Sequence, residues 1–169
     1  MGNLINSTML IEPIDLAVDE EGSIWISDFY NIKKFGKTGN LISVFNPINT
    51  SETSYSGIDF LNGNMYVGAC TQSKNVVIVL NANGEITKQI NLQGNNSKGC
   101  GNPCGSSYSN NMVFVLMSDS EDISSQHIQV YNSSSGVYSY GFGGNQCNDV
   151  PPNYLCQPFN GIEFIPQNF

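Results

Sequence analysis

Short alternations of apolar and polar residues, separated by Gly, Asn and Asp, run along the chain and predict β-strands. The pattern is clearest over residues 13–45, where four such segments follow one another: 14–18, 24–27, 32–35 and 41–45. Each connection carries a residue type that supplies the positive φ of hairpin turns. The i, i+3, i+4, i+7 apolar spacing of an amphipathic helix is not found. The pattern therefore predicts an all-β fold built from antiparallel, four-stranded meanders.

The same order of strands and turns recurs further along the chain. A second copy spans approximately 57–90, a third spans 105–140, and the first strand of a fourth lies in 158–169. The turn glycines before the last strand of each full copy are Gly39, Gly84 and Gly136. A period in the forties with four strands per copy is typical of β-propeller blades. The alternative, a β-sandwich with evenly spaced strands, is disfavoured because the turn residues recur at matching offsets.

The first copy resembles an NHL repeat. Residues 14–45 carry Ala-Val-Asp at 17–19, a turn glycine at Gly22, and then Asp28 and Asn31 at the family's positions. The resemblance extends less closely over the later copies and covers most of the chain. It implies a β-propeller of four-stranded antiparallel NHL-type blades. It implies less about function, because this fold carries lyases, esterase-like enzymes, RNA readers, sensors and scaffolds.

The number of blades predicts an incomplete ring, or a ring completed by another chain. Residues 1–169 form a single propeller segment with three full blades and one further strand. Propellers typically close with at least four blades. We expect either a fragment of a larger propeller or self-association through open blade edges. Residues 7–11 are a candidate latch strand, lying outside an inner strand at 161–165.

The charge of the chain argues against nucleic acids as partners. The net charge is −8, all six basic residues are Lys, and there is no Arg. Nucleic-acid surfaces need clustered positive charge and rely on Arg, so nucleic-acid binding is not expected. Membrane insertion is not expected either, since the sequence has no long apolar span. No signal peptide is visible at the N-terminus.

Cysteines and glycosylation sequons favour an extracellular or cell-surface location. We predict two local disulfides that staple inter-blade loops, Cys100–Cys104 and Cys147–Cys156, in preference to a zinc clip. Cys70, on a predicted second strand, is expected to be a small buried residue. The candidate glycosylation sites are Asn6, Asn49, Asn95 and Asn132. Chance is the alternative for these sequons, because the chain is rich in Asn and Ser.

No set of residues predicts catalysis. The chain has one histidine, His127, so it cannot form a zinc site made of several histidines. The sequence also gives no reason to pair His127 with a nucleophilic Ser or Cys. Ca²⁺ is the only candidate cofactor, since it prefers carboxylate and carbonyl oxygens. The candidate metal ligands are Asp15, Asp59 and Glu163 on first strands, with Asp119 and Asp122 in an acidic segment. For that segment, a solvated hairpin tip is the preferred interpretation.

Aromatic residues recur at one position of the blade. Trp25, Tyr66 and Phe114 align on successive second strands, where blade-to-blade packing is preferred over a ligand platform. The leading prediction is therefore a non-catalytic module that recognises a protein or a glycan, or that assembles with itself. The alternative is a fragment of a six-bladed NHL-type hydrolase or lyase whose active site lies mostly in other blades.

Overall fold

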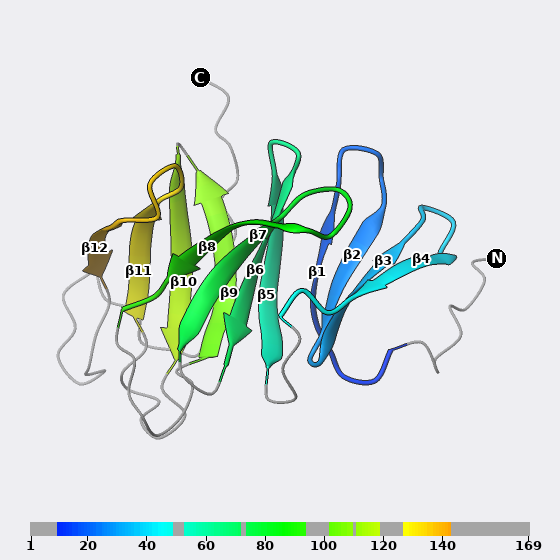
Figure 1. The fold of residues 1–169 in the computed structure, drawn as a ribbon, viewed down its shortest axis with the longest axis horizontal. Helices are drawn as coiled ribbons and strands as arrows, with labels where there is room; N and C mark the ends of the chain where they lie inside the picture. The colour runs from blue at the N-terminus through cyan, green and yellow to red at the C-terminus, as the bar shows by residue number, and fades with distance from the viewer. Residues whose placement is uncertain are drawn as a thin grey trace, which may run out of the picture.

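Three four-stranded antiparallel sheets make up the fold, and they lie side by side in chain order (Figure 1). The computed structural model describes residues 10–48, 53–71, 74–93, 102–109, 111–118 and 127–142. No helix occurs within these ranges. The prediction of an all-β fold with four-stranded blades is confirmed.

Each sheet is a meander in which sequence neighbours pair. Blade 1 contains β1 (Pro13–Val18), β2 (Ile24–Asp28), β3 (Asn31–Phe35) and β4 (Leu41–Phe45). Blade 2 contains β5 (Ser54–Leu61), β6 (Asn64–Cys70), β7 (Asn75–Leu80) and β8 (Ile86–Asn91). Blade 3 contains β9 (Asn102–Ser109), β10 (Met112–Ser118), β11 (His127–Asn132) and β12 (Tyr138–Phe142). The predicted partial blade at 158–169 and the predicted latch strand at 7–11 fall outside or largely outside the described residues.

In each blade, the glycine of the turn before the last strand adopts a positive φ angle. The φ angles of Gly39, Gly84 and Gly136 are 84°, 78° and 71°. An L-residue with a side chain rarely adopts these values, so glycine supports the tight turn at each of these points. The recurrence of the turn glycines in the sequence therefore reports a recurring turn geometry.

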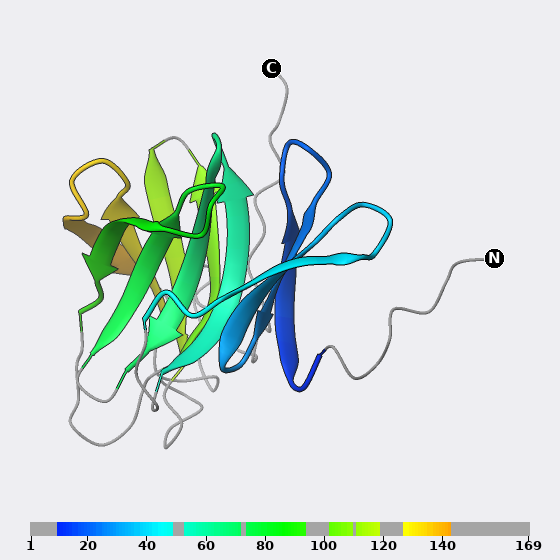
Figure 2. The same cartoon turned by 45° about the vertical axis from the view of Figure 1, so that its right-hand side comes forward.

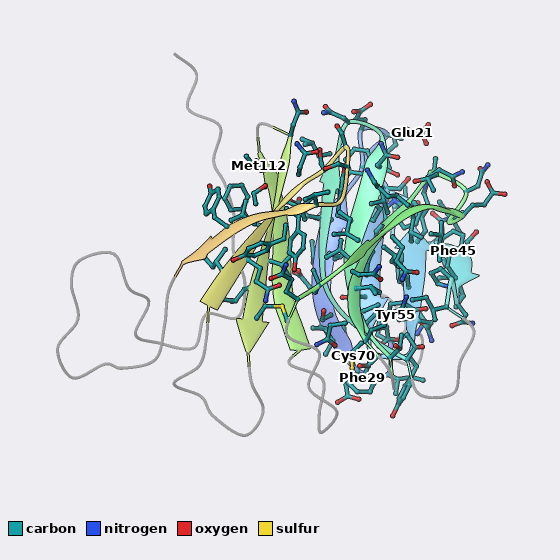
Figure 3. All side chains as sticks on the ribbon, turned by 60° about the vertical axis from the view of Figure 1, so that its left-hand side comes forward. Glu21, Phe29, Phe45, Tyr55, Cys70 and Met112 are labelled. Atoms are coloured by element: carbon teal, nitrogen blue, oxygen red, sulfur yellow. The ribbon has the colours of Figure 1, made fainter. Side chains whose placement is uncertain are left out.

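Two apolar clusters hold the blades together. Trp25 and Ile32 of blade 1 pack against a cluster that contains Ile58 and Val67 of blade 2. On the opposite face of blade 2, Val77 packs with residues of blade 3. Figure 2 shows the same three sheets from another angle, and Figure 3 shows the side chains that fill the spaces between them. Burial between sheets is the main stabilising contribution, since each sheet alone has no core.

Tyrosine hydroxyl groups bind the connections between blades. The Tyr55 hydroxyl accepts a hydrogen bond from the Ile48 amide at 3.0 Å, just after β4. The Tyr131 hydroxyl accepts one from the Gln93 amide at 2.7 Å, just after β8. Burial raises the pKa of both tyrosines above the ordinary value, although these hydrogen bonds oppose the shift. Each connection is thus anchored by the blade that follows it.

The first strand of blade 3 is longer than the sequence predicts. We expected a strand over 106–108, whereas β9 spans Asn102–Ser109. Cys104 consequently lies within a strand that pairs with β10, and its expected position in a loop before the strand is wrong. Pro103 and Gly105 obscure this part of the strand in the sequence, because neither is typical of a strand interior.

Candidate functional site

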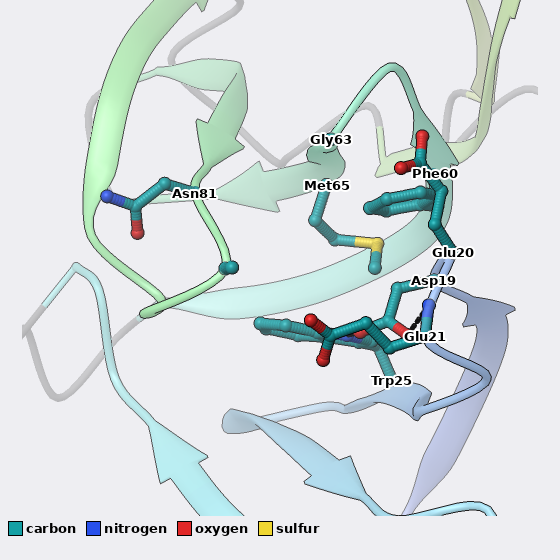
Figure 4. A pocket seen from close by; sticks show the side chains of 9 residues that line it. Asp19, Glu20, Glu21, Trp25, Phe60, Gly63, Met65 and Asn81 are labelled. Atoms are coloured by element: carbon teal, nitrogen blue, oxygen red, sulfur yellow. Dashed lines mark hydrogen bonds between the residues drawn. The ribbon is translucent and has the colours of Figure 1, made fainter.

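A pocket of about 110 Å³ lies between blades 1 and 2 (Figure 4). Three turns and three strands contribute to it: the β1–β2, β5–β6 and β7–β8 turns, and β2, β5 and β6. The lining residues are Asp19, Glu20, Glu21, Trp25, Phe60, Gly63, Met65, Asn81 and Ala82. The pocket therefore combines apolar and aromatic side chains with three carboxylates.

Asp19 shapes the turn that carries these carboxylates. Its Oδ1 accepts hydrogen bonds from the amides of Ser23 at 2.7 Å and Glu21 at 3.1 Å. Gly22, with φ of 79°, completes the turn by donating its amide to the Asp19 carbonyl. An aspartate that bonds its own turn in this way fixes the backbone on either side. Glu20 and Glu21 are held at the pocket as a result.

The second carboxylate oxygen of Asp19 holds Trp25 in place. It accepts a hydrogen bond from the indole Nε1 at 2.9 Å and an ion pair from Lys34 Nζ at 3.2 Å. The Trp25 ring stacks on Phe45 with centroids 5.2 Å apart, and Lys34 Nζ lies 4.7 Å from the indole centroid. Such stacking and cation–π contacts fix a ring in one orientation. Trp25 is therefore a rigid part of the pocket.

The charge of Asp19 is stabilised in the folded protein. Burial opposes the ionised form, but hydrogen bonds from Trp25 and Ser23 and the contact with Lys34 outweigh it. The pKa of Asp19 is consequently lower than its ordinary value of 3.8. Asp19 is an anion over the physiological pH range, and it forms an ion pair with Lys34.

Blade 2 supplies the opposite side of the pocket. In Figure 4 the Phe60 and Met65 side chains face the Trp25 ring. A Cβ on Gly63 would meet no heavy atom within 4 Å, so the backbone there borders open space. Asn81 stabilises the β7–β8 turn by accepting hydrogen bonds from the amides of Asn83 and Glu85, both at 3.0 Å.

Glu20 and Glu21 make the pocket electronegative. Both are exposed, and they lie beside Asp19 on the same turn. In the described part of the chain, the two ion pairs are Lys33–Asp28 and Lys34–Asp19. Neither pair includes Glu20 or Glu21, so their charges are available to a ligand. The pocket suits a cation with an aliphatic or planar stem better than an anion.

Two of the predicted metal ligands, Asp15 and Asp59, lie on the first strands of blades 1 and 2. The Asp15 carboxylate accepts hydrogen bonds from the amides of Ile58 at 3.0 Å and Leu16 at 2.9 Å, and so links blade 1 to blade 2. Burial raises the pKa of Asp15, although the two amides oppose the shift. Asp59 lies on β5, and its Oδ1 accepts a hydrogen bond from the Phe60 amide at 2.8 Å. Among the described residues, no three His, Cys, Asp or Glu side chains form a metal-binding group. Asp119, Asp122 and Glu163 lie outside these residues.

Cys70, at the end of β6, is disulfide-bonded. Its expected burial is confirmed, since the residue is 5% exposed, but the disulfide was not predicted. The chain has five cysteines, so the partner must be one of the other four if the bridge is internal. An internal bridge to Cys70 would use one of these four, so at most one of the predicted bridges, Cys100–Cys104 or Cys147–Cys156, could form beside it, and each stays a prediction. The sequence pattern favoured close pairs because spacing along the chain does not report which strands lie together.

The aligned aromatics lie on the predicted strands. Trp25, Tyr66 and Phe114 lie on β2, β6 and β10, and each packs in or against an apolar cluster. Trp25 also lines the pocket, so it serves both packing and the site. The sequence did not indicate the contributions of Phe60, Met65, Asn81 and Ala82. Their one signal is position, since they lie in or beside the β5–β6 and β7–β8 turns of blade 2.

The remaining predicted positions are the glycosylation sequons and the single histidine. Asn132 lies at the end of β11, where its Oδ1 accepts hydrogen bonds from the amides of Ser134 and Ser135. Its glycosylation stays a prediction. The other sequons, Asn6, Asn49 and Asn95, lie outside the described residues. His127 is the first residue of β11.

Comparisons with known proteins identify a family and a fold. The family model of the Teneurin NHL domain matches residues 2–112. A comparison with curated proteins gave no match. A solved protein of unknown function from Bacteroides caccae is similar, with 14% identity and a TM-score of 0.58 over 79% of this chain and 47% of that chain. A europium-containing methanol dehydrogenase is also similar, with 12% identity and a TM-score of 0.56 over 75% of this chain and 31% of that chain.

These structural similarities indicate the propeller fold alone, given the low identities. The chain spans less than half the length of either solved structure. As for membrane association, the described residues include no helix of the length and apolarity that a membrane span requires.

Proposed function

The chain belongs to the Teneurin NHL domain family, and from this premise we propose that it is a non-catalytic recognition module that binds a protein partner. The partner would insert a basic side chain into the pocket between blades 1 and 2. The observation that carries the proposal is the pair of exposed carboxylates, Glu20 and Glu21, at the mouth of a pocket whose floor includes the buried ring of Trp25, which is 1% exposed. Exposed carboxylates form charge-assisted hydrogen bonds with a lysine or arginine side chain.

A protein partner fits this site better than a glycan or a nucleic acid. Neutral sugars can donate hydroxyl hydrogen bonds to the two carboxylates but leave the negative charge uncompensated, and acidic glycans are repelled by it. Phosphate groups would be repelled too, and the net charge of −8 extends the repulsion over the molecule. A basic segment of a protein is the class of ligand for which both the pocket and the net charge are favourable.

An extracellular or cell-surface location supports the same proposal. The disulfide at Cys70 is typical of an oxidising compartment. The four sequons of the chain and its match to the Teneurin NHL domain are consistent with that location. In such a setting, rigid domains that present loops for protein binding are common.

The site can be tested with small probes, because Trp25 is the single tryptophan and reports on the pocket directly. The protein is titrated with acetyl-arginine amide while Trp25 fluorescence and amide NMR shifts are recorded. We expect saturable binding with a dissociation constant on the order of 1 mM, with shifts centred on Glu20, Glu21 and Gly63. Added salt should weaken the binding, since the carboxylates are exposed.

Matched variants separate the pocket from general attraction to an acidic protein. Glu21→Gln should weaken binding roughly 3- to 5-fold, as expected for the loss of an exposed charge pair. Glu12→Gln removes the same charge from an exposed residue that does not line the pocket, and should leave the binding unchanged. Acetyl-glutamate amide and methyl glucoside are the ligand controls. Binding of the glucoside in place of arginine, or equal effects of the two substitutions, would contradict the proposal.

A further inference from the structure

Two Asn-Gly pairs lie in turns of the described part of the chain, and the fold holds them differently. Asn62–Gly63 joins β5 to β6, and Asn83–Gly84 lies in the turn between β7 and β8. A third pair, at 160–161, lies outside the described residues. An asparagine that precedes glycine can lose its side-chain amide, because glycine has no side chain to hinder attack by its own amide nitrogen. The two described pairs therefore place the same chemistry in two settings.

The Asn62–Gly63 turn leaves the glycine nitrogen accessible. The two residues are exposed and have φ angles of 48° and 76°, as in the centre of a type I′ hairpin turn. The closing hydrogen bond of such a turn joins the flanking residues, here the paired Leu61 and Asn64. Among the hydrogen bonds of the described turns, none has the Gly63 amide as donor, and a Cβ on Gly63 would meet no atom within 4 Å. The Gly63 nitrogen can therefore approach the Asn62 side chain.

The Asn83–Gly84 pair is held in place by Asn81. The Gly84 amide donates to the Asn81 carbonyl at 2.9 Å, and the Asn83 amide donates to Asn81 Oδ1 at 3.0 Å. Gly84 also lies against the ring of Phe45, which a Cβ at this position would overlap. To reach the Asn83 side chain, the Gly84 nitrogen would have to leave its hydrogen bond and turn beside this ring. The fold therefore protects this pair.

We infer that Asn62 is a site of spontaneous deamidation, and that the carboxylate so formed stands at the mouth of the pocket. The Gly63 nitrogen attacks Asn62 Cγ and forms a succinimide ring. The bond from Cγ to Nδ2 breaks, and Nδ2 leaves as ammonia together with the proton of the Gly63 amide. Water then opens the ring at either carbonyl and gives aspartate or isoaspartate. Nothing is oxidised or reduced, and water is the only co-reactant.

The product changes the charge of the pocket. Gly63 lines the pocket together with Glu20 and Glu21, as Figure 4 shows, and Asn62 precedes it in the same turn. Conversion of Asn62 adds one negative charge beside the two exposed carboxylates. This consequence rests on the proposed function, under which an added carboxylate strengthens the attraction for a basic side chain. The deamidation itself does not depend on what the pocket binds.

A time course of the folded full chain in mildly alkaline buffer measures the reaction. Samples are reduced and cut with trypsin, which places Asn62 in fragment 38–74 and Asn83 in fragment 75–88. Mass spectrometry then gives the extent and the position of conversion in each fragment. We expect Asn62 to convert at least about tenfold faster than Asn83, because reaction at Asn83 must first break a hydrogen bond. In urea, where both turns are lost, the two rates should be similar.

Two substitutions separate the chemistry from its setting. Asn81→Ala removes the Oδ1 acceptor that holds Asn83, so it should raise the rate at Asn83 roughly 3- to 10-fold and leave the rate at Asn62 unchanged. Asn62→Asp carries the charge of the product from the start. It should bind acetyl-arginine amide roughly 2- to 3-fold more tightly than the unmodified protein.

Equal rates at Asn62 and Asn83 in the folded protein would overturn the inference, because the fold would then not distinguish the two pairs. Conversion of Asn62 that proceeds in urea and stops in the folded protein would overturn it as well. If Asn62→Asp binds acetyl-arginine amide no more tightly than the unmodified protein does, the new carboxylate does not stand at the mouth of the pocket. If neither protein binds this probe, the proposed function fails, whereas the deamidation rates are unaffected.

Discussion

At the scale of single residues, Asp19 links the backbone of a turn to the geometry of the pocket. One carboxylate oxygen binds two amides of the turn, and the other binds Trp25 and Lys34. Removal of its charge should loosen the turn and the indole ring together. The sequence showed an acidic turn here. It could not show that the carboxylate reaches Trp25, because that contact depends on the side-chain directions at the two ends of the turn.

The pKa of Asp19 gives this role a testable sign. Because the folded-state pKa is lower than the ordinary 3.8, ionisation stabilises the fold. The stabilisation is complete above the pKa of the unfolded chain and is lost as the pH falls through the folded-state value. Asp19→Asn should therefore cost about 1–3 kcal/mol of unfolding free energy at pH 7. The difference from the unmodified protein should shrink below about pH 4, as measured by urea unfolding across the pH range.

Asp15 provides the matched control, because burial raises its pKa. For a carboxyl group of this kind, protonation favours the folded state, so its contribution is present at low pH and is lost as the pH rises through the folded-state pKa. Asp15→Asn should therefore change the pH dependence in the opposite direction to Asp19→Asn. Parallel pH profiles for the two variants would contradict the assignment of the two carboxyl groups.

At the scale of elements, two glycines with nearly the same φ separate backbone strain from packing. Gly63 and Gly84 have φ angles of 76° and 78°. A Cβ on Gly63 meets open space, whereas a Cβ on Gly84 would overlap the ring of Phe45. Gly63→Ala should therefore cost only the strain, about 1 kcal/mol. Gly84→Ala should cost about 2–4 kcal/mol, because overpacking at the blade interface is added.

Chemical unfolding of the two variants measures this difference. The fluorescence of Trp25 should also change in Gly84→Ala, since Phe45 stacks on its ring. Equal free-energy costs for the two substitutions would mean that the β7–β8 turn does not pack against blade 1.

The order of strands and turns could be predicted from the sequence because both are local. The contact of Gly84 with Phe45 could not, because it joins residues of different blades.

At the scale of the whole molecule, the repeat predicted the propeller but not how its parts are joined. Alternation and turn glycines determine each sheet, and a period in the forties then indicates blades. The pocket between blades 1 and 2 depends on the relative placement of two sheets. Local patterns contain no information on that placement. The disulfide of Cys70 is the clearest case, since sequence proximity favoured other pairs.

The disulfide can be established by mass mapping without reduction. Trypsin cuts after Lys37, Lys74, Lys88 and Lys98, so Cys70 falls in fragment 38–74 and the other four cysteines fall in fragment 99–169. An internal bridge from Cys70 predicts that these two fragments stay linked until a reductant is added. If the two local bridges formed and Cys70 were free, the fragments would separate without reduction.

The same bridge should contribute to the stability of the whole fold. Any internal partner of Cys70 closes a loop of at least 30 residues, since the nearest other cysteine is Cys100. Constraint of the unfolded chain by such a loop is worth about 3–4 kcal/mol. Reduction should therefore lower the unfolding free energy by about that amount, and the loss should be smaller in Cys70→Ser, where the bridge cannot form. An equal loss in both proteins would mean that another disulfide carries the stability. A bridge from β6 to residue 100 or beyond ties blade 2 to the part of the chain that follows blade 2. Reduction should therefore loosen the packing between blades, and its effect should extend beyond a single turn.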